Sequence, residues 1–162
     1  MISIESFRPE EWAAYKVLRL RALLDTPDAF GMLHSEEAEQ PDGYWLARVS
    51  NVEVAHFVAR GPEGDVGLSV GAPYRGREGC AGLFGMWVAP EARGRGVGKR
   101  LVQSVIDWAR TQGYERILLD VGDENQAAIA LYQSMGFVPS GIRGTLPPPR
   151  EHIPEHERVL EL

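Results

Sequence analysis

The sequence has little cysteine, no long apolar run and no excess of basic residues. Its single cysteine, Cys80, excludes an internal disulfide bond and fits a reducing compartment. No apolar stretch approaches the ~18 residues that a membrane-spanning helix needs, and no basic segment followed by an apolar one opens the chain. We therefore expect a cytoplasmic protein with no membrane partner.

The charge balance excludes further classes of protein. There are 17 Lys and Arg residues against 23 Asp and Glu, and the net charge is −6, whereas nucleic-acid binding requires a basic surface. The 4 histidines and the one cysteine show no metal-ligand spacing. We therefore expect neither a nucleic-acid partner nor a metal. A length of 162 residues, 44% of them hydrophobic, predicts a single domain over residues 1–162 with a buried core.

The most informative stretch runs from Gly82 to Val102. An apolar segment of strand character leads through a proline turn into three alternating glycines, Gly94, Gly96 and Gly98, and an amphipathic helix follows. The same region carries four basic residues: Arg93, Arg95, Lys99 and Arg100. A helix N-terminus presents free N–H groups and a positive dipole end, and glycine lets the backbone approach a bound anion closely. The stretch therefore predicts a phosphate or pyrophosphate site.

Residue spacing separates this loop from two other phosphate-binding motifs. A Walker loop needs glycine five residues before its Gly-Lys pair and Ser or Thr after it, but these positions hold Arg93 and Arg100. The dinucleotide fingerprint needs glycine where Lys99 stands. The remaining pattern, Arg93-x-x-Gly96-x-Gly98, resembles the acetyl-CoA pyrophosphate loop of the GNAT superfamily of N-acetyltransferases, whose pattern is Gln/Arg-x-x-Gly-x-Gly/Ala.

A second segment, residues 119–137, resembles the same superfamily. It reads LDVGDENQAAIALYQSMGF, in which Asn, Ala, Leu-Tyr and Gly-Phe follow a strand at the family's spacing. Two independent motifs in the family's order make a chance resemblance improbable. The resemblance implies an α/β fold (α+β in some schemes), the acyl-CoA N-acyltransferase fold: a twisted, mixed but mostly antiparallel central sheet of about six to seven strands, flanked by about four helices.

Hydrophobic periodicity and turn residues place the expected elements along the chain. Strands are expected at 2–7, 51–59, 66–70, 83–88 and 117–121, from 137 onward, and at 157–162. Helices are expected from residue 9 to about 24, at about 42–49, from the glycine loop to Gly113, and from Asn125 to Gly136. Residues 29–40 show no regular pattern, residues 71–79 indicate an exposed hairpin loop, and residues 145–154, with four prolines, cannot be regular.

The resemblance also implies that acetyl-CoA is the co-substrate and suggests which residues bind it. The backbone of Met86, Trp87 and Val88 would pair with the pantetheine arm and the thioester carbonyl, at a splay between two neighbouring strands. Asn125 would contact the lower pantetheine. The pyrophosphate would lie on the glycine loop, which consists of Arg93, Gly94, Arg95, Gly96, Val97, Gly98 and Lys99.

Tyr132 matches the family position that protonates or hydrogen-bonds the leaving sulfur. Simple packing on the apolar face of its helix is the alternative. A thiol with a pKa near ~8.5 and a tyrosine with a pKa near ~10 make full proton donation uphill by about 2 kcal/mol, so a hydrogen bond to the sulfur is a sufficient role. We predict that Tyr132 is catalytic.

The general base is less clearly indicated. A primary ammonium with a pKa near ~10.4 must lose a proton before it attacks the thioester. Many family members place a glutamate on the strand before the glycine loop, but residues 83–88 contain no acid. Asp120 is the proposed substitute, because a carboxylate twelve residues before the tyrosine serves as base in some family members; an ion pair on the sheet is the alternative.

The segment between the first two helices lines the acceptor site in this superfamily. The resemblance therefore suggests a group of substrate-binding candidates here, namely Phe30, His34, Glu36 and Glu37. The charged members of this group are further candidates for the base, with plain solvation as the alternative. The proline-rich stretch 147–152 is expected to border the substrate mouth, and Cys80 to be a small buried residue.

These observations predict an acetyl-CoA-dependent N-acetyltransferase. The acceptor would be a primary amine of a small molecule or peptide that attacks the thioester directly in a ternary complex, without a metal and without an acyl-enzyme. The protein would be a monomer or a homodimer. The missing strand glutamate motivates one alternative with the same fold, a catalytically weak acyl-CoA sensor.

Overall fold

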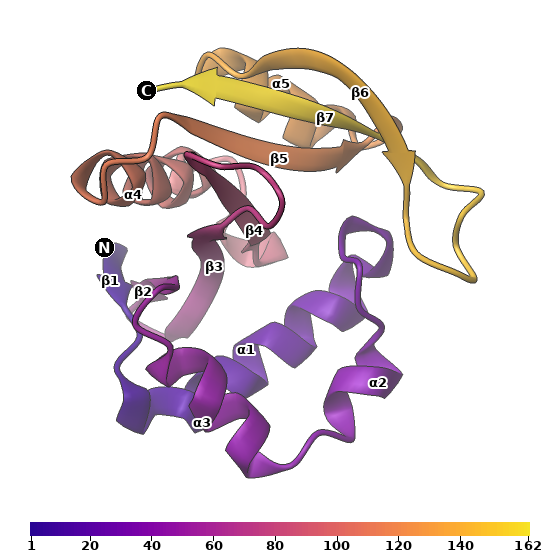
Figure 1. Ribbon diagram of the computed structural model, residues 1–162. Coiled ribbons are helices and arrows are strands. Elements are labelled where there is room, and N and C mark those ends of the chain that lie inside the picture. The colour runs from indigo at the N-terminus through magenta and orange to yellow at the C-terminus, as the bar shows by residue number, and fades with distance from the viewer.

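The computed structural model describes residues 1–162 as a seven-stranded sheet with helices packed against it (Figure 1). The strands are β1 (Ser3–Ser6), β2 (Ala55–Gly61), β3 (Gly64–Pro73), β4 (Cys80–Val88), β5 (Arg116–Gly122), β6 (Val138–Thr145) and β7 (Pro154–Glu161). The α-helices are α1 (Trp12–Asp25), α2 (His34–Ala38), α3 (Asp42–Ser50), α4 (Val97–Thr111) and α5 (Gln126–Ser134). The predicted mixed sheet with flanking helices is confirmed.

The sheet has the order β1-β2-β3-β4-β5-β7-β6, and its single parallel pair is β4 with β5. These two strands pair only at their first residues, where Cys80–Gly82 lie opposite Arg116–Leu118. Beyond Gly82 the pairing stops, and the two strands diverge. A break inside a sheet leaves backbone N–H and C=O groups that need another partner. The splay expected from the sequence therefore lies between β4 and β5.

A bulge in β4 lies beside this break. From Leu68 to Val70 the register advances two residues on β3 but three on β4, so β4 carries one extra residue. Gly85 lies in this bulge with φ of +57°, a left-handed conformation that disfavours residues with a side chain. A Cβ at Gly85 would also lie 3.2 Å from Nη1 of Arg19. Glycine thus permits both the bulge and the close approach of Arg19 to the strand.

A small hydrophobic cluster packs Val97 and Leu101 of α4 against Ala59 of β2, and two larger clusters hold the helices to the sheet. One joins α1 and α3 to β2 and β3 and includes the fully buried Tyr15 and Trp45. The other joins α4 and α5 to β4 and β5. Helix α4 contributes Leu101, Val105 and Ala109, which share one face at four-residue spacing and are completely buried. The amphipathic helix predicted after the glycine loop is therefore present as α4, with its apolar face buried.

Several local predictions were wrong. Strand β2 begins at Ala55 rather than at residue 51, because a turn closes through the Val54 N–H and the Asn51 carbonyl at 3.2 Å. Strand β3 continues to Pro73, so the hairpin loop is shorter than predicted. Helix α2 lies in the segment for which the sequence shows no regular pattern. Strand β6 runs to Thr145; its side chains are exposed along its whole length, and therefore no apolar alternation marks it.

Two loops that are distant in sequence meet at the open end of the break. The loop between β6 and β7 reaches toward the loop between α1 and α2 (Figure 1). Arg150 joins them, because its guanidinium donates hydrogen bonds to the carbonyls of Pro27 at 2.8 Å and Gly31 at 3.1 Å. The open end of the break is thus framed by both loops.

Candidate active site

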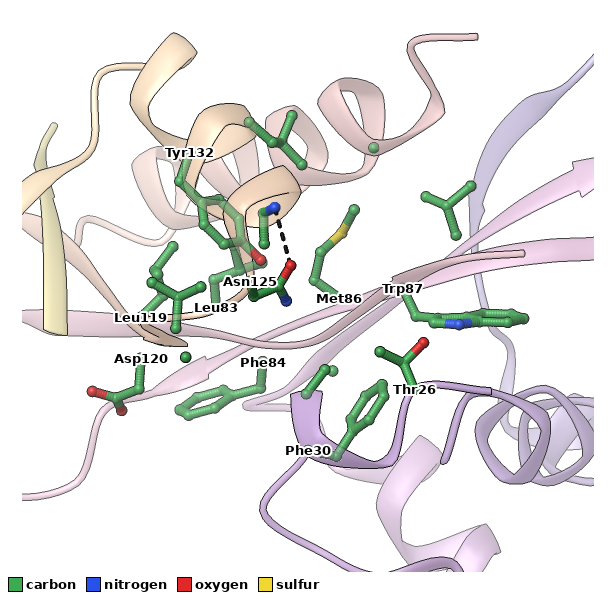
Figure 2. A pocket seen from close by; sticks show the side chains of 18 of the residues that line it. Thr26, Phe30, Leu83, Phe84, Met86, Trp87, Leu119, Asp120, Asn125 and Tyr132 are labelled. Carbon is green, nitrogen blue, oxygen red and sulfur yellow. Dashed lines mark hydrogen bonds between the residues drawn. The ribbon is translucent and has the colours of Figure 1, made fainter. Parts of the chain in front are cut away.

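A pocket of about 1000 Å³ follows the break between β4 and β5. Its walls come from the first turn of α4, from α5, and from the two loops joined by Arg150. Figure 2 shows the arrangement: Tyr132 and Asn125 face the pocket from one side of the sheet, and Phe30, Phe84 and Asp120 lie on the other. One continuous space therefore connects the glycine loop with the loop between α1 and α2.

Two different structural features explain why glycine occurs at three positions of the loop. Gly94 and Gly96 each have φ of +77°, which favours glycine, and Gly96 is the residue that precedes α4. A Cβ on Gly98 would lie 3.2 Å from Leu131 and 3.2 Å from Met86, so close packing restricts this position. Because Gly96 has no side chain that could cap the helix, the first-turn N–H groups remain available to an anion.

The basic residues of the loop do not all face the pocket. Lys99 lines it, whereas Arg95 lies outside its lining. Arg93 borders the pocket, but its guanidinium donates to the Val88 carbonyl at 2.9 Å and pairs with Asp25 at 2.6 Å. The side chain of Arg93 therefore ties the glycine loop to β4 and to the end of α1.

Trp87 is part of the same connection. Its side chain lies in the core, and its indole N–H donates to Asp25 at 2.9 Å. Hydrogen bonds from Trp87 and from the Thr26 hydroxyl, together with the guanidinium of Arg93, lower the pKa of Asp25 to about 2. Because the Trp87 side chain is engaged in the core, only the backbone of Trp87 is in a position to meet a ligand in the break.

Met86, Val88, Asn125 and Tyr132 all line the pocket. The Asn125 side-chain oxygen accepts the Ala128 N–H at 3.3 Å and caps α5 (dashed line in Figure 2), so its amide nitrogen can donate to a ligand. The Tyr132 hydroxyl faces the same space as Asn125 and Met86.

Tyr132 is held in place by packing. Its ring packs edge-on against Phe137 at a centroid distance of 5.8 Å, and the residue is only 7% exposed. Burial raises the pKa of Tyr132 above its usual value, so the hydroxyl keeps its proton at neutral pH. The arrangement therefore combines both sequence interpretations: the ring packs and the hydroxyl can donate.

Two carboxylates lie at the β5–β7 side of the pocket. Asp120 lies there and accepts a hydrogen bond from the Tyr74 hydroxyl at 3.2 Å, and burial raises its pKa. Glu155 lines the same pocket; burial and the nearby Asp120 charge raise the pKa of Glu155. A raised pKa makes each carboxylate a stronger proton acceptor than an ordinary one. Glu155 was not predicted, because only the pairing of β5 with β7 brings it here.

Of the four acceptor-site candidates, Phe30 alone lines the pocket. His34 lies at the start of α2, and Glu36 accepts the Leu33 N–H at 2.9 Å, which begins that helix. Glu37 is completely buried and faces protein groups only. The placement of His34, Glu36 and Glu37 therefore gives no support to their predicted contact with substrate.

The sequence reasoning missed several pocket residues. They are Arg19, Thr26, Met32, Arg48, Leu83, Phe84, Thr145, Leu146 and Glu155. For Arg19 a signal existed: it follows Tyr15 by four residues and so shares the buried face of α1. A charged residue on an otherwise buried helix face needs a partner or a ligand. Pro147, from the proline-rich stretch, also lines the pocket, as expected.

The rest of the chain offers no candidate metal site, disulfide bond or membrane-spanning helix. Cys80 is buried and unpaired, and it lies outside this pocket. No group of three or more His, Cys, Asp or Glu side chains has an arrangement suited to a metal ion. None of the helices has the length and apolar character needed to cross a membrane.

Residues 4–137 match the model of the acetyltransferase (GNAT) family. Human N-acetyltransferase 8 is 38% identical over 104 residues, which make up 64% of this chain and 42% of that protein. Human N-acetyltransferase 8B is 33% identical over 130 residues, 80% of this chain and 51% of that protein. The chain thus spans about half the length of the curated relatives it matches.

Solved structures share the whole fold. The structure of yncA from Salmonella typhimurium, with its cofactor acetyl-CoA, aligns with a TM-score of 0.82 and 20% identity over 100% of this chain and 94% of that one. A GNAT protein from Kribbella flavida aligns with a TM-score of 0.75 and 26% identity over 99% and 98% of the two chains. With the family model matching residues 4–137, these findings show that the chain belongs to the GNAT acetyltransferase family.

Proposed function

We propose that this protein transfers the acetyl group of acetyl-CoA to a primary amine, which attacks the thioester while both substrates are bound. The continuity of the pocket carries the proposal. The same space touches an anion-binding helix N-terminus, unpaired strand backbone, a protonated tyrosine and two carboxylates. Direct transfer needs these groups within one site.

The donor end of the pocket suits acetyl-CoA, which supplies an activated acyl group when bound. The first turn of α4 would hold the pyrophosphate, because its N–H groups and the helix dipole favour negative charge. Beyond Gly82, β4 would offer the backbone groups that β5 no longer pairs to the amides of the pantetheine arm. The Asn125 amide would donate to the same arm.

The catalytic steps follow from the residues at the break. The neutral amine nitrogen bonds to the thioester carbonyl carbon, the carbon–sulfur bond breaks, and the sulfur leaves as the thiolate of CoA. Tyr132 would donate a hydrogen bond to that sulfur, since burial raises its pKa and keeps the hydroxyl protonated. Asp120, or Glu155 beside it, would accept the proton that the amine releases, directly or through water.

The test is acceptor-dependent release of the CoA thiol. Purified protein with acetyl-CoA is given a panel of amines that includes α-amino acids, their amides, polyamines and short peptides with free N-termini. We expect saturable thiol release with at least one class. Acetyl-CoA that binds without acceptor-dependent release for any class would instead identify the acyl-CoA sensor, which the missing strand glutamate motivates.

A further inference from the structure

Two arginines share one buried carboxylate at the acceptor end of the pocket. Arg19 approaches Oε1 of Glu37 with Nε at 2.8 Å and Nη2 at 2.7 Å. Arg48 Nη1 donates to the other oxygen at 2.7 Å, and the Tyr44 hydroxyl donates to that oxygen at 2.8 Å. Both carboxylate oxygens are therefore occupied by donors from the protein.

The charges of this cluster do not cancel. The two guanidinium groups carry two positive charges, and Glu37 supplies one negative charge. The adjacent ring of His56 adds none, because burial and the two arginines lower the pKa of His56 to about 4. No other carboxylate pairs with Arg19 or Arg48. Arg19 is buried and the Arg48 side chain is 29% exposed, so the excess positive charge lies at the partly open edge of the cluster, where it favours an anionic ligand.

The free edge of the cluster faces the pocket. Arg19 is 6% exposed and Nη1 of Arg19 has no hydrogen-bond acceptor in the protein, yet both arginines line the pocket. The Arg19 guanidinium lies 4.9 Å from the ring centroid of Phe30. Its Nη1 lies against Gly85, where a Cβ would be 3.2 Å away. Nη1 is thus fixed beside the β4 bulge, next to the backbone at Met86 that the proposed function assigns to the thioester.

We propose that the acceptor is a free α-amino acid whose carboxylate binds Arg19 and Arg48; this deepens the proposed function and rests on it. A guanidinium matches a carboxylate in shape and charge. One carbon atom separates the amine from the carboxylate in an α-amino acid, so a carboxylate at Nη1 holds the amine beside the β4 bulge. A polyamine and a peptide N-terminus have no carboxylate at this separation.

The wall around the arginines indicates the side chain of the acceptor. Phe30, Met32, Phe84 and Leu146 line this end of the pocket, and Figure 2 shows Phe30 and Phe84 on the same side of β4. Phe84 is 41% exposed although it is a large apolar residue. Apolar surface of this kind favours an apolar ligand group. The structure therefore favours apolar amino acids such as leucine, methionine and phenylalanine.

The deciding experiment compares each acid with its amide. The CoA-saturated protein is titrated calorimetrically with L-leucine, L-methionine and L-phenylalanine, and with the amide of each. We expect at least one acid to bind about 30-fold more tightly than its amide, since the amide leaves the guanidinium groups without an anion. Amides that bind as tightly as the acids, or a complete lack of binding by all six compounds, overturn the inference.

Two variants test whether Arg19 causes the tighter binding of the acid than of its amide. Arg19→Lys keeps the charge next to Glu37 but removes the Nη1 donor, and it should reduce the acid-to-amide ratio by about tenfold. Arg21→Lys is the matched control on α1, because Arg21 pairs with Glu91 at 2.6 Å outside the pocket, and the ratio should not change. A folded Arg19→Lys with an unchanged ratio contradicts the inference. If that variant does not fold, the acid-to-amide ratio of the unaltered protein decides.

The same data separate this inference from the proposed function. If the acids bind preferentially but no amine of any class releases thiol, the transfer reaction is wrong and the carboxylate site stands. If polyamines or amides are acetylated while the acids neither bind nor react, the transfer reaction stands and the carboxylate site is wrong.

Discussion

The two ends of the pocket are built in opposite ways. The donor end uses the backbone of one continuous stretch, residues 85–99, with Asn125 and Tyr132 added from the next strand–helix unit. The acceptor end uses side chains from α1, α3, β4, β5, β7 and two loops. Backbone geometry depends on a few glycines at fixed spacing, whereas the side-chain set exists only after the chain has folded.

The two ends should also differ in function: the donor end in cofactor binding, and the acceptor end in the choice of acceptor. The donor end presents N–H groups and a helix dipole, which suit one common cofactor part, the pyrophosphate. The acceptor end presents a positively charged arginine–glutamate cluster, two carboxylates with raised pKa values and an apolar wall. Changes at the donor end should therefore alter cofactor affinity, and changes at the acceptor end should alter stability, turnover or acceptor choice.

The largest effect is expected from Glu37→Gln at the acceptor end. The substitution keeps the shape but leaves the buried Arg19 and the partly exposed Arg48 without a counter-charge, which should cost about 3 kcal/mol of unfolding free energy. Urea denaturation measures it. Glu36→Gln, one residue earlier and exposed, is the control and should cost less than about 1 kcal/mol, the value of a helix-start contact. Equal stability losses in the two variants would show that the arginine–glutamate cluster contributes little.

The next effect should come from Tyr132→Phe, at the boundary between the two ends. Removal of one proton or hydrogen-bond donor to the leaving sulfur should lower kcat about 100-fold. The dissociation constant for acetyl-CoA should change less than about twofold, because the buried ring still packs against Phe137. Turnover equal to that of the unaltered protein at every pH would remove Tyr132 from the mechanism.

A smaller effect is expected from Asp120→Asn. Because burial raises the pKa of Asp120, the carboxylate form is lost at a higher pH than for an ordinary aspartate. The base is active only when deprotonated, so kcat/KM should fall as the pH falls through that pKa. At pH 7 the variant should retain about one tenth of the activity, because Glu155 and water can still take the proton. Full activity with an unchanged pH profile would assign the role to Glu155.

The smallest effect is expected on acetyl-CoA affinity, from a glycine substitution in the donor loop compared with one in an ordinary turn. Gly96→Ala and Gly76→Ala both place a side chain at positive φ, +77° and +80°, and each should cost about 1 kcal/mol of stability. Only Gly96 lines the pocket, so only Gly96→Ala should weaken acetyl-CoA binding, by about fivefold. Calorimetric titration of both variants measures this. Equal affinities would mean that the loop conformation does not control cofactor binding.

Much of the donor end could be predicted from the sequence, for a physical reason. Positive φ angles at Gly94 and Gly96 favour glycine, and close packing at Gly98 favours a small residue, so the conformation leaves a short, recognisable pattern. Asn125 must cap α5 and is therefore fixed relative to Tyr132. Local constraints of this kind are visible in a single sequence.

The acceptor end could not be predicted because its residues meet only through tertiary contacts. Glu155 reaches the pocket through the register in which it lies opposite Gly122 on the neighbouring strand. The sequence predicts that Glu37 contacts substrate, with plain solvation as the alternative, but the residue is completely buried and pairs with Arg19 and Arg48 from two other helices. No local pattern records these partners.

The central claim is that one pocket holds donor and acceptor together, and initial-velocity kinetics test it most directly. Thiol release is measured against acetyl-CoA concentration at several fixed concentrations of the best acceptor in the panel. Simultaneous occupancy of both ends predicts double-reciprocal lines that intersect. Parallel lines, the pattern of an acetyl group stored on the protein between two separate half-reactions, would contradict the account.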